Sequence, residues 1–331
     1  MRPEEDLVPG PLRGELRRWH GLGRGARPRL NGRARASVAL LAALACSTHI
    51  SLAHGQACCA SGSGLTPGWL GNHDKALVGV QVRGSATWGT YPYGDGFFER
   101  AATRDARYEG GLFGALRLLP RAQVAAFAPV DVTRRFGAHG REAGGGVGDL
   151  SLMGRYDLVR TGELRIPGIA LLAGALLPTG RPVDRATGLL AADATGTGTF
   201  EFDLGMSVEQ TFGRALLHAT ALAGPRLPRD VLGQREALGT RGLFVLAGGY
   251  VFEGETSLLL SLSHASEGDA SIDGARARGT GTRTTQAAVI AVVPLSDSLK
   301  LRSTVFSDLP PLGENRPTLA GSSLAILWSF R

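Results

Sequence analysis

The feature of this sequence that most constrains its fold is a period-2 alternation of apolar and polar residues along most of the chain. In the segment 147–158, Leu152 and Tyr156 share one parity, whereas Arg155 and Asp157 share the other. Successive side chains of a β-strand point to opposite faces, so this pattern predicts strands with one apolar face. No segment beyond residue 75 is both long and helically periodic, which favours an all-β chain.

The spacing of these segments indicates how the strands are connected. Twelve segments carry the pattern: 76–88, 107–118, 123–134, 147–159, 166–178, 198–211, 215–224, 242–252, 256–265, 284–294, 299–308 and 320–331. Short turns lie at 120–121, 160–163, 213–214, 253–255 and 296–298. Long polar segments lie at 89–106, 135–146, 179–197, 225–241, 266–283 and 309–319. Long and short connections in alternation, with an even strand number, predict an antiparallel transmembrane β-barrel of about twelve strands.

The membrane explains both the strand length and the closure. Hydrocarbon cannot satisfy an open sheet edge, and a spanning strand needs about 9–11 residues. We therefore expect short periplasmic turns, long extracellular loops, a lipid-facing apolar side and a polar lumen. A secreted soluble barrel or sandwich also alternates, but it would have connections of mixed length. The segments 242–252 and 284–294 are apolar on both faces, and their orientation stays open.

The N-terminal region has the pattern of an export signal. Arginines up to Arg35 precede an uncharged apolar run at 36–45, which is too short to span a bilayer as a helix. The small residues Gly55 and Ala57 suggest cleavage after Ala57. The expected organisation is a leader at 1–57, a short periplasmic segment at 58–75, and a barrel at 76–331, placed in a Gram-negative type of outer membrane.

The charge distribution argues against a nucleic-acid partner. The whole chain carries a net charge of +7. Residues 1–35 hold nine Arg and four acids, which is a net charge of +5, so the remainder carries only +2 in dispersed positions. The sequence has no zinc-ligand spacing and no P-loop, and we expect neither a metal nor another cofactor. The adjacent Cys58 and Cys59 cannot staple a fold.

Three stretches together resemble a known barrel family. They are GVGDLSLMGRY at 146–156, LPTG at 177–180 and GTGTFEFDLG at 196–205. In this order and spacing they are similar to the outer-membrane barrel family named after the meta-pathway of phenol degradation. The resemblance implies a channel or transporter for small solutes, in some members aromatic or hydrophobic ones. The terminal Phe330 resembles the signal read by the barrel-assembly machinery, although Arg331 follows it.

The strand faces predict which charged side chains line the lumen. These candidates are Arg83, Glu109, Arg117, Asp149, Arg155, Asp157, Glu201, Asp203, Glu209, Lys300 and Arg302. Rings of charged side chains set selectivity in a pore. Because both signs are present, pairing across the lumen is an equal alternative. We expect replacement of Asp149 and Asp203 by Ala to alter conductance if both line the pathway.

Two other classes of function remain open. His264 and Ser266 share a parity, and the stretch 264–268 resembles part of the outer-membrane phospholipase, which is also a twelve-stranded barrel. Glu267 stands where that enzyme has Asn, so no orienting residue is available for the histidine. We therefore expect no catalytic residues. A closed structural barrel, which would anchor the envelope without transport, is the third class.

Overall fold

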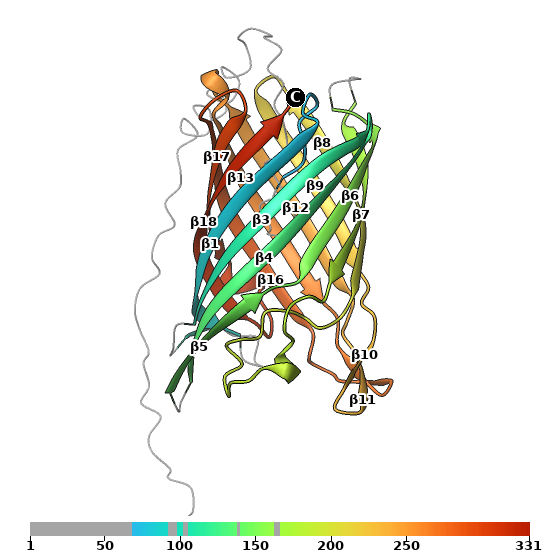
Figure 1. Cartoon of the computed structure of the whole chain (residues 1–331), viewed down its shortest axis with the longest axis vertical. Helices are drawn as coiled ribbons and strands as arrows, with labels where there is room; N and C mark the ends of the chain where they lie inside the picture. The colour runs from blue at the N-terminus through green and yellow to red at the C-terminus, as the bar shows by residue number, and fades with distance from the viewer. Residues whose placement is uncertain (1–67, 92–97, 102–104, 138–139, 162–165) are drawn as a thin grey trace, which may run out of the picture. The chain divides into compact units, whose positions relative to one another are not determined.

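The computed structural model describes residues 68–91, 98–101, 105–137, 140–161 and 166–331. The predicted leader and its cleavage site lie outside these residues. The described chain forms a closed antiparallel barrel of twelve strands (Figure 1), so the predicted fold class is confirmed. Within the described part of the chain, no helix combines the length and apolarity needed to cross a membrane.

Each barrel strand pairs with its neighbours along the chain. The barrel strands are β1 (Ala76–Thr90), β3 (Ala106–Leu119), β4 (Ala122–Gly137), β5 (Gly140–Val147) with β6 (Leu150–Val159), β7 (Gly168–Leu177), β8 (Glu201–Phe212), β9 (Ala215–Gly224), β12 (Arg241–Val251), β13 (Ser257–Glu267), β16 (Thr282–Pro294), β17 (Leu299–Asp308) and β18 (Pro317–Phe330). The last strand closes the barrel by pairing with the first, from Ala76 opposite Phe330 to Thr90 opposite Pro317. This pairing closes the sheet into a ring, while β5 at the loop end pairs with β4 alone.

Shorter elements are additional to the twelve barrel strands. They are β2 (Glu99–Arg100), η2 (Val183–Arg185), η3 (Glu253–Glu255) and η4 (Pro310–Leu312), together with a four-stranded sheet of β10 (Arg229–Val231), β11 (Gln234–Ala237), β14 (Ser271–Ile272) and β15 (Ala275–Arg276). We call the side with the short connections and the start of β1 the turn end, which is uppermost in Figure 1, and the opposite side the loop end. The four-stranded sheet joins two of the long connections at the loop end.

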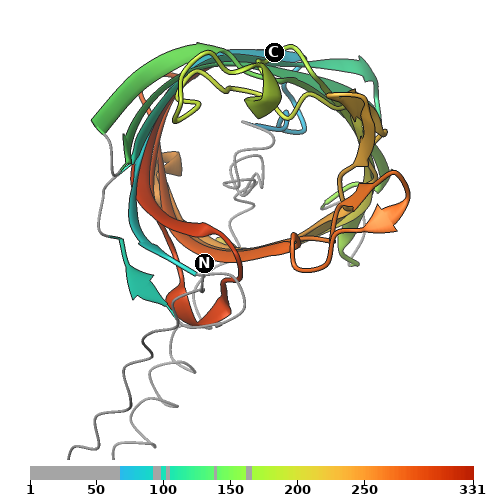
Figure 2. The same ribbon diagram turned by 90° about the horizontal axis from the view of Figure 1, so that it is seen from below.

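One predicted loop is wrong. The sequence predicts a long polar connection at 135–146, whereas β4 and β5 continue there as a paired hairpin. The strand pairing continues in this hairpin because another segment, 178–200, packs against its inner face. Arg135 donates a hydrogen bond to the Leu190 carbonyl at 2.8 Å, and Glu142 accepts bonds from backbone amides of the same segment. Figure 2, viewed along the barrel, shows this segment on the inner side of the wall.

The outer face of the barrel is apolar. Its exposed side chains include Val80, Leu112, Leu204 and Val305. Exposed aromatic residues gather near the turn end (Tyr156, Phe212, Tyr250, Trp328 and Phe330) and near the loop end (Tyr108, Phe202 and Phe244). Phe202 and Phe212 are ten residues apart on β8, which at about 3.4 Å per residue and a tilt of about 40° separates them by roughly 26 Å along the barrel axis.

The burial of their side chains fixes the orientation of the segments 242–252 and 284–294, which the sequence pattern left open. On β12, Leu243, Val245 and Ala247 are buried inside, while Phe244 and Leu246 face out. On β16, the buried side chains are Ala288, Ile290 and Val292. Strands β9, β12, β13 and β16 together form an apolar cluster within the barrel, which consists of Leu216, Ala247, Leu259, Ile290 and Val292. The inner wall is therefore polar in some sectors and apolar in others.

Candidate functional site

The turn end of the lumen is filled by the segment that precedes β1. Trp69 and Leu70 are 4% and 5% exposed. They pack in one buried cluster with inward-facing side chains, which are Leu77, Phe113, Ala115, Ala125, Phe127, Met153, Leu172, Ala325 and Leu327. The Leu70 amide donates to Gln123 Oε1 at 2.8 Å. We call residues 68–74 the N-terminal plug.

Arginines of the wall hold this plug in place. Arg117 donates from Nη2 to the Gly71 carbonyl at 2.6 Å and from Nε to the Asp74 carbonyl at 3.0 Å. The Arg155 guanidinium lies 5.9 Å from the centre of the Trp69 ring, within the range of a cation–π contact. Two of the predicted lumen residues thus bind a segment of the chain itself.

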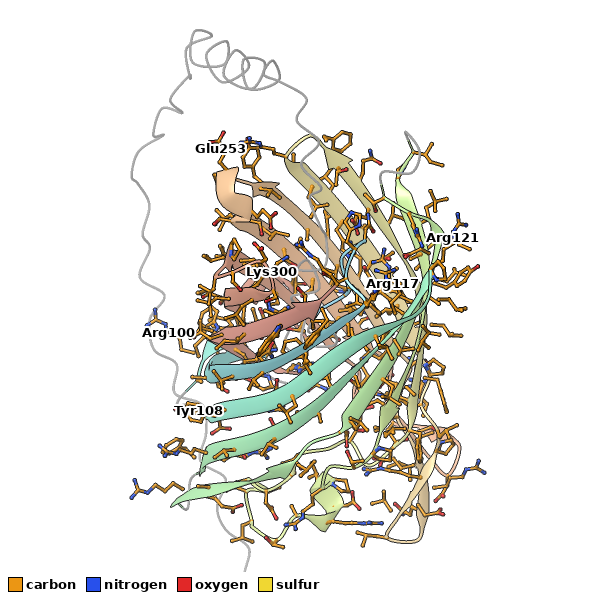
Figure 3. All side chains as sticks on the ribbon, turned by 45° about the horizontal axis from the view of Figure 1, so that its top comes forward. Arg100, Tyr108, Arg117, Arg121, Glu253 and Lys300 are labelled. Atoms are coloured by element: carbon orange, nitrogen blue, oxygen red, sulfur yellow. The ribbon has the colours of Figure 1, made fainter. Side chains whose placement is uncertain are left out.

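A second polar group lies at the same end. Arg155 pairs with Asp157 at 2.7 Å and reaches Glu209 at 3.9 Å, and His218 Nδ1 lies 4.0 Å from Glu209. On the strands that flank β18, Arg302 of β17 donates to Gln81 Oε1 of β1 at 2.9 Å. Arg117 and Lys300 are labelled at this end in Figure 3. Lys300 shares the inward parity of Arg302 on β17.

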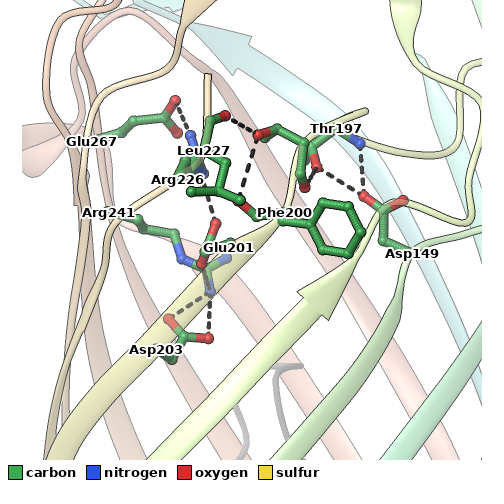
Figure 4. A network of polar contacts seen from close by, with 10 residues as sticks. Asp149, Thr197, Phe200, Glu201, Asp203, Arg226, Leu227, Arg241 and Glu267 are labelled. Carbon is green, nitrogen blue, oxygen red and sulfur yellow. Dashed lines mark hydrogen bonds and ion pairs between the residues drawn. The ribbon is translucent and has the colours of Figure 1, made fainter. Parts of the chain in front are cut away.

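The loop end holds a network of ion pairs between strands and connections (Figure 4). Glu201 of β8 is fully buried and accepts a bond from Arg226 Nε at 2.7 Å. Arg226 also pairs with Glu267 of β13, and Arg241 of β12 bridges Glu201 and Asp203. Three strands (β8, β12 and β13) and the 225–240 connection are therefore tied together by paired charges, which buried charges require.

A polar cavity of about 240 Å³ opens beside this network. Its lining includes Arg83, Arg107, Glu109, Arg241 and Asp308 from β1, β3, β12 and β17. Arg107 makes a bidentate pair with Asp131, at 2.8 Å for each bond, and lies 3.7 Å from Glu109. The cavity is the largest difference in character between the two ends, because the turn end is packed with side chains.

Asp149, predicted as a lumen residue, instead lies in the break between β5 and β6. Its carboxylate accepts hydrogen bonds from the Gly180 amide at 2.9 Å, the Thr197 amide at 2.7 Å and the Thr197 hydroxyl at 2.9 Å. A side chain on Gly196 would meet Asp149 Oδ1 at 2.4 Å, so only glycine allows this approach. The three stretches that carry the family resemblance thus meet at one carboxylate.

The remaining predicted residues fall into two groups. Glu109, Glu201 and Asp203 join Arg83 around the loop-end network and cavity. Arg117, Arg155, Asp157, Glu209, Lys300 and Arg302 lie toward the turn end. The residues of these sites that are not among the predicted ones are Trp69, Arg107, Asp131, Arg226 and Arg241. Arg107 and Asp131 stood at predicted strand ends with the parity of their inward neighbours, which was a usable signal.

The phospholipase-like pair faces outward. His264 and Ser266 have the parity of the exposed Leu260 and Leu262 on β13. His264 Nδ1 is hydrogen-bonded to Thr285 Oγ1 at 2.8 Å, and among the described residues no hydrogen bond joins the histidine to Ser266. The described residues also contain no cluster of three metal-ligating side chains.

Comparisons with known proteins agree with this architecture. The fold is similar to that of the COG4313 outer membrane channel from Pseudomonas putida F1, with a TM-score of 0.64, 19% identity, and coverage of 81% of this chain and 98% of that one. Weaker likenesses connect it with the translocator domain of the autotransporter NalP from Neisseria meningitidis (TM-score 0.44, 10% identity, coverage 90% and 98%). The CymD monoaromatic hydrocarbon channel is also a weak likeness (0.41, 9%, 78% and 89%).

The likeness to the COG4313 channel is one of fold, and it agrees with a closed twelve-stranded barrel of the outer-membrane kind. At 19% identity the first likeness extends to the fold alone, and the two weaker ones support no argument. No family model matches the sequence, and no curated protein matches it either. The resemblance to the phenol meta-pathway family therefore stays a prediction from its three motifs.

Proposed function

We propose that this protein is an outer-membrane channel that passes small solutes through the barrel lumen. The observation that carries the proposal is a closed wall that is apolar outside and holds a polar cavity inside. An apolar outer face with aromatic bands at both ends suits a lipid bilayer. The proposal retains the expected leader at 1–57, export, insertion by the barrel-assembly machinery and the barrel at 76–331.

The lumen determines what class of solute fits. The N-terminal plug occupies the turn end with Trp69 and Leu70, so a wide aqueous pore is not the resting state. Cation–π and apolar contacts inside the barrel support small solutes with aromatic or hydrophobic parts. In this proposal, five of the predicted lumen residues either contact the passing solute or stabilise the barrel wall. They are Arg83, Glu109, Glu201, Asp203 and Arg302.

Single-channel recording tests the proposal. The refolded full chain is added to planar bilayers, and the refolded state is checked beforehand by its heat-dependent shift on a gel and its β-type circular dichroism. We expect discrete conductance steps, together with liposome swelling by small solutes. A barrel that inserts, as shown by protection from protease, and yet gives neither signal would contradict a channel and favour the closed structural barrel.

A hydrolase is the weaker alternative. His264 and Ser266 face the outer surface near the loop end, as a lipid-cleaving enzyme would require. The hydrogen bond of His264 to Thr285, however, engages the nitrogen that an orienting residue would use. We expect no calcium-dependent phospholipase activity. A calcium-dependent phospholipase activity of the natural chain that disappears in Ser266→Ala would overturn this expectation.

A further inference from the structure

We propose that the loop-end cavity binds small organic anions whose carboxylate pairs with Arg83 and whose apolar body rests on the neighbouring hydrophobic wall. This inference rests on the proposed function, because it names the class of solute that the passage accepts. The acidic side chains of the cavity already have partners. Among the described residues, two of its guanidinium groups have neither an ion pair nor a side-chain hydrogen bond: Arg83, which is half-buried, and Arg316, at the exposed rim.

The carboxylates of the cavity are occupied. Asp308 accepts from Gln286 Nε2 at 3.0 Å through one oxygen and from the Leu319 amide at 2.7 Å through the other. Glu109 lies 3.7 Å from Arg107. A solute cation would therefore have to displace existing partners from both acids.

The other arginines deeper in the lining are occupied as well. Arg107 is held by Asp131 in a bidentate pair, and Arg241 by Glu201 and Asp203. Each of these guanidinium groups has lost most of its capacity to bind a further anion. Arg316 also lines the cavity, at its exposed rim.

Arg83 differs from these arginines. Its guanidinium carbon stands 4.1 Å from the centre of the Phe306 ring. Glu109, its register partner on β3, and Asp308 line the same cavity, but among the described residues no carboxylate oxygen lies within 4.0 Å of the guanidinium and no hydrogen bond reaches its side chain. Stacking on a ring fixes the plane of the guanidinium and leaves the N–H groups at its edge free to donate to an oxyanion. The group is thus oriented, half-buried and open to a carboxylate.

The shape of the cavity limits the ligand. At about 240 Å³, it is below the roughly 300–1,000 Å³ of sites for drug-sized ligands. Leu243, Ala265 and Leu319 contribute an apolar side of the lining, and Ser85, Ser263 and Thr284 a polar one. A compact carboxylate with an aryl or short alkyl body matches both sides, whereas a sugar or a long chain does not.

Binding of benzoate to the refolded full chain in detergent micelles, measured by calorimetry, tests the inference. We expect Arg83→Gln to weaken benzoate binding at least about tenfold, because a hydrogen-bonded charge is lost. The benzoate affinity of Arg83→Lys should fall between those of the natural chain and Arg83→Gln, since lysine keeps the charge but not the forked donor geometry of the guanidinium. The matched control is Arg214→Gln, which removes the same charge from the exposed pair with Glu253 at the turn end and should bind benzoate normally.

Neutral benzyl alcohol and cationic benzylammonium complete the design. Both should bind at least about tenfold more weakly than benzoate. The inference is overturned if benzoate does not bind, if Arg83→Gln and Arg214→Gln behave alike, or if either analogue binds as well as benzoate. Calorimetry requires no passage across a membrane. Benzoate binding without conductance would therefore contradict the proposed channel and leave the Arg83 site standing.

Discussion

The two ends of the lumen are filled and lined by different physical means. At the turn end, Trp69 and Leu70 of the N-terminal plug fill the space with apolar surface. At the loop end, paired charges such as Glu201, Arg226 and Arg241 line the space and leave a cavity between them. Apolar contacts are non-directional and fill a volume, whereas ion pairs fix a few geometries and leave gaps.

The difference indicates where each function resides. The plug is held by burial and by a few hydrogen bonds to its backbone. A network that connects β8, β12, β13 and the 225–240 connection instead fixes the shape of the mouth. We therefore expect substitutions at the loop end to change stability and substitutions at the turn end to change permeation.

The largest effect is expected for Glu201→Gln. This carboxylate is fully buried and pairs with two arginines, so its loss should lower the free energy of unfolding by about 3 kcal/mol. Glu253→Gln is the turn-end control, since its side chain is 86% exposed, and a surface pair contributes about 0–1 kcal/mol. Urea unfolding in lipid vesicles measures both. Equal losses would remove the distinction between the two ends.

A smaller but local effect is expected for Asp149→Ala. Three donors of the 178–200 segment lose their acceptor, at a cost of about 2 kcal/mol or about 30-fold in the opening equilibrium. Trypsin cleavage after Arg185 should accelerate accordingly, because cleavage follows the open population. Asp297→Ala, in a turn-end connection, serves as the control. Unchanged cleavage would show that Asp149 does not hold this segment.

The turn-end counterpart is the double substitution Trp69→Ser with Leu70→Ser. Loss of two buried apolar side chains weakens the N-terminal plug. We expect single-channel conductance to rise several-fold while the heat-dependent gel shift is retained. Asn72→Ser, at an exposed position of the same segment, should leave conductance unchanged. A conductance equal to that of the natural chain would show that the plug does not limit permeation.

The smallest effect concerns pH at the loop end. Hydrogen bonds from Thr187 and Arg181 hold the pKa of the Asp193 carboxyl well below its ordinary value of 3.8. Because the folded pKa is depressed, the contribution of Asp193 is present above pH 3.8 and is lost only as the pH falls through the lowered pKa. Carboxyl NMR shifts in micelles should show no titration of Asp193 between pH 7 and pH 4. A midpoint near 3.8 would contradict the pairing.

Local pattern was sufficient for the wall of the barrel. The segments predicted at 215–224 and 299–308 coincide with β9 and β17, because a period of two and a nearby turn are both local signals. By parity, the alternation also predicts the inner face for Glu109, Glu201 and Asp203; Glu201 and Asp203 are buried, and Glu109 lines the loop-end cavity. It misread 135–146, since nothing local indicates that a distant segment packs against that hairpin.

The contacts inside the lumen depend on chain closure. The Leu70 amide and Gln123 are 53 residues apart, and Arg302 and Gln81 are 221 residues apart. Such pairs form only when the whole sheet curls around a common interior, which no local periodicity describes. The same holds for β12, whose two apolar faces became distinguishable only when one of them packed against neighbouring strands.

By itself, the sequence determined the strands, their turns and the class of fold, because alternation and loop length are properties of neighbouring residues. Only the tertiary structure decided that Asp149 holds a connection, that Trp69 fills the turn end and that Arg83 stacks on Phe306 beside a cavity. The ion pairs, the packing of the plug and the position of the cavity depend on which residues distant in the sequence come together. Closure of the barrel determines which residues these are.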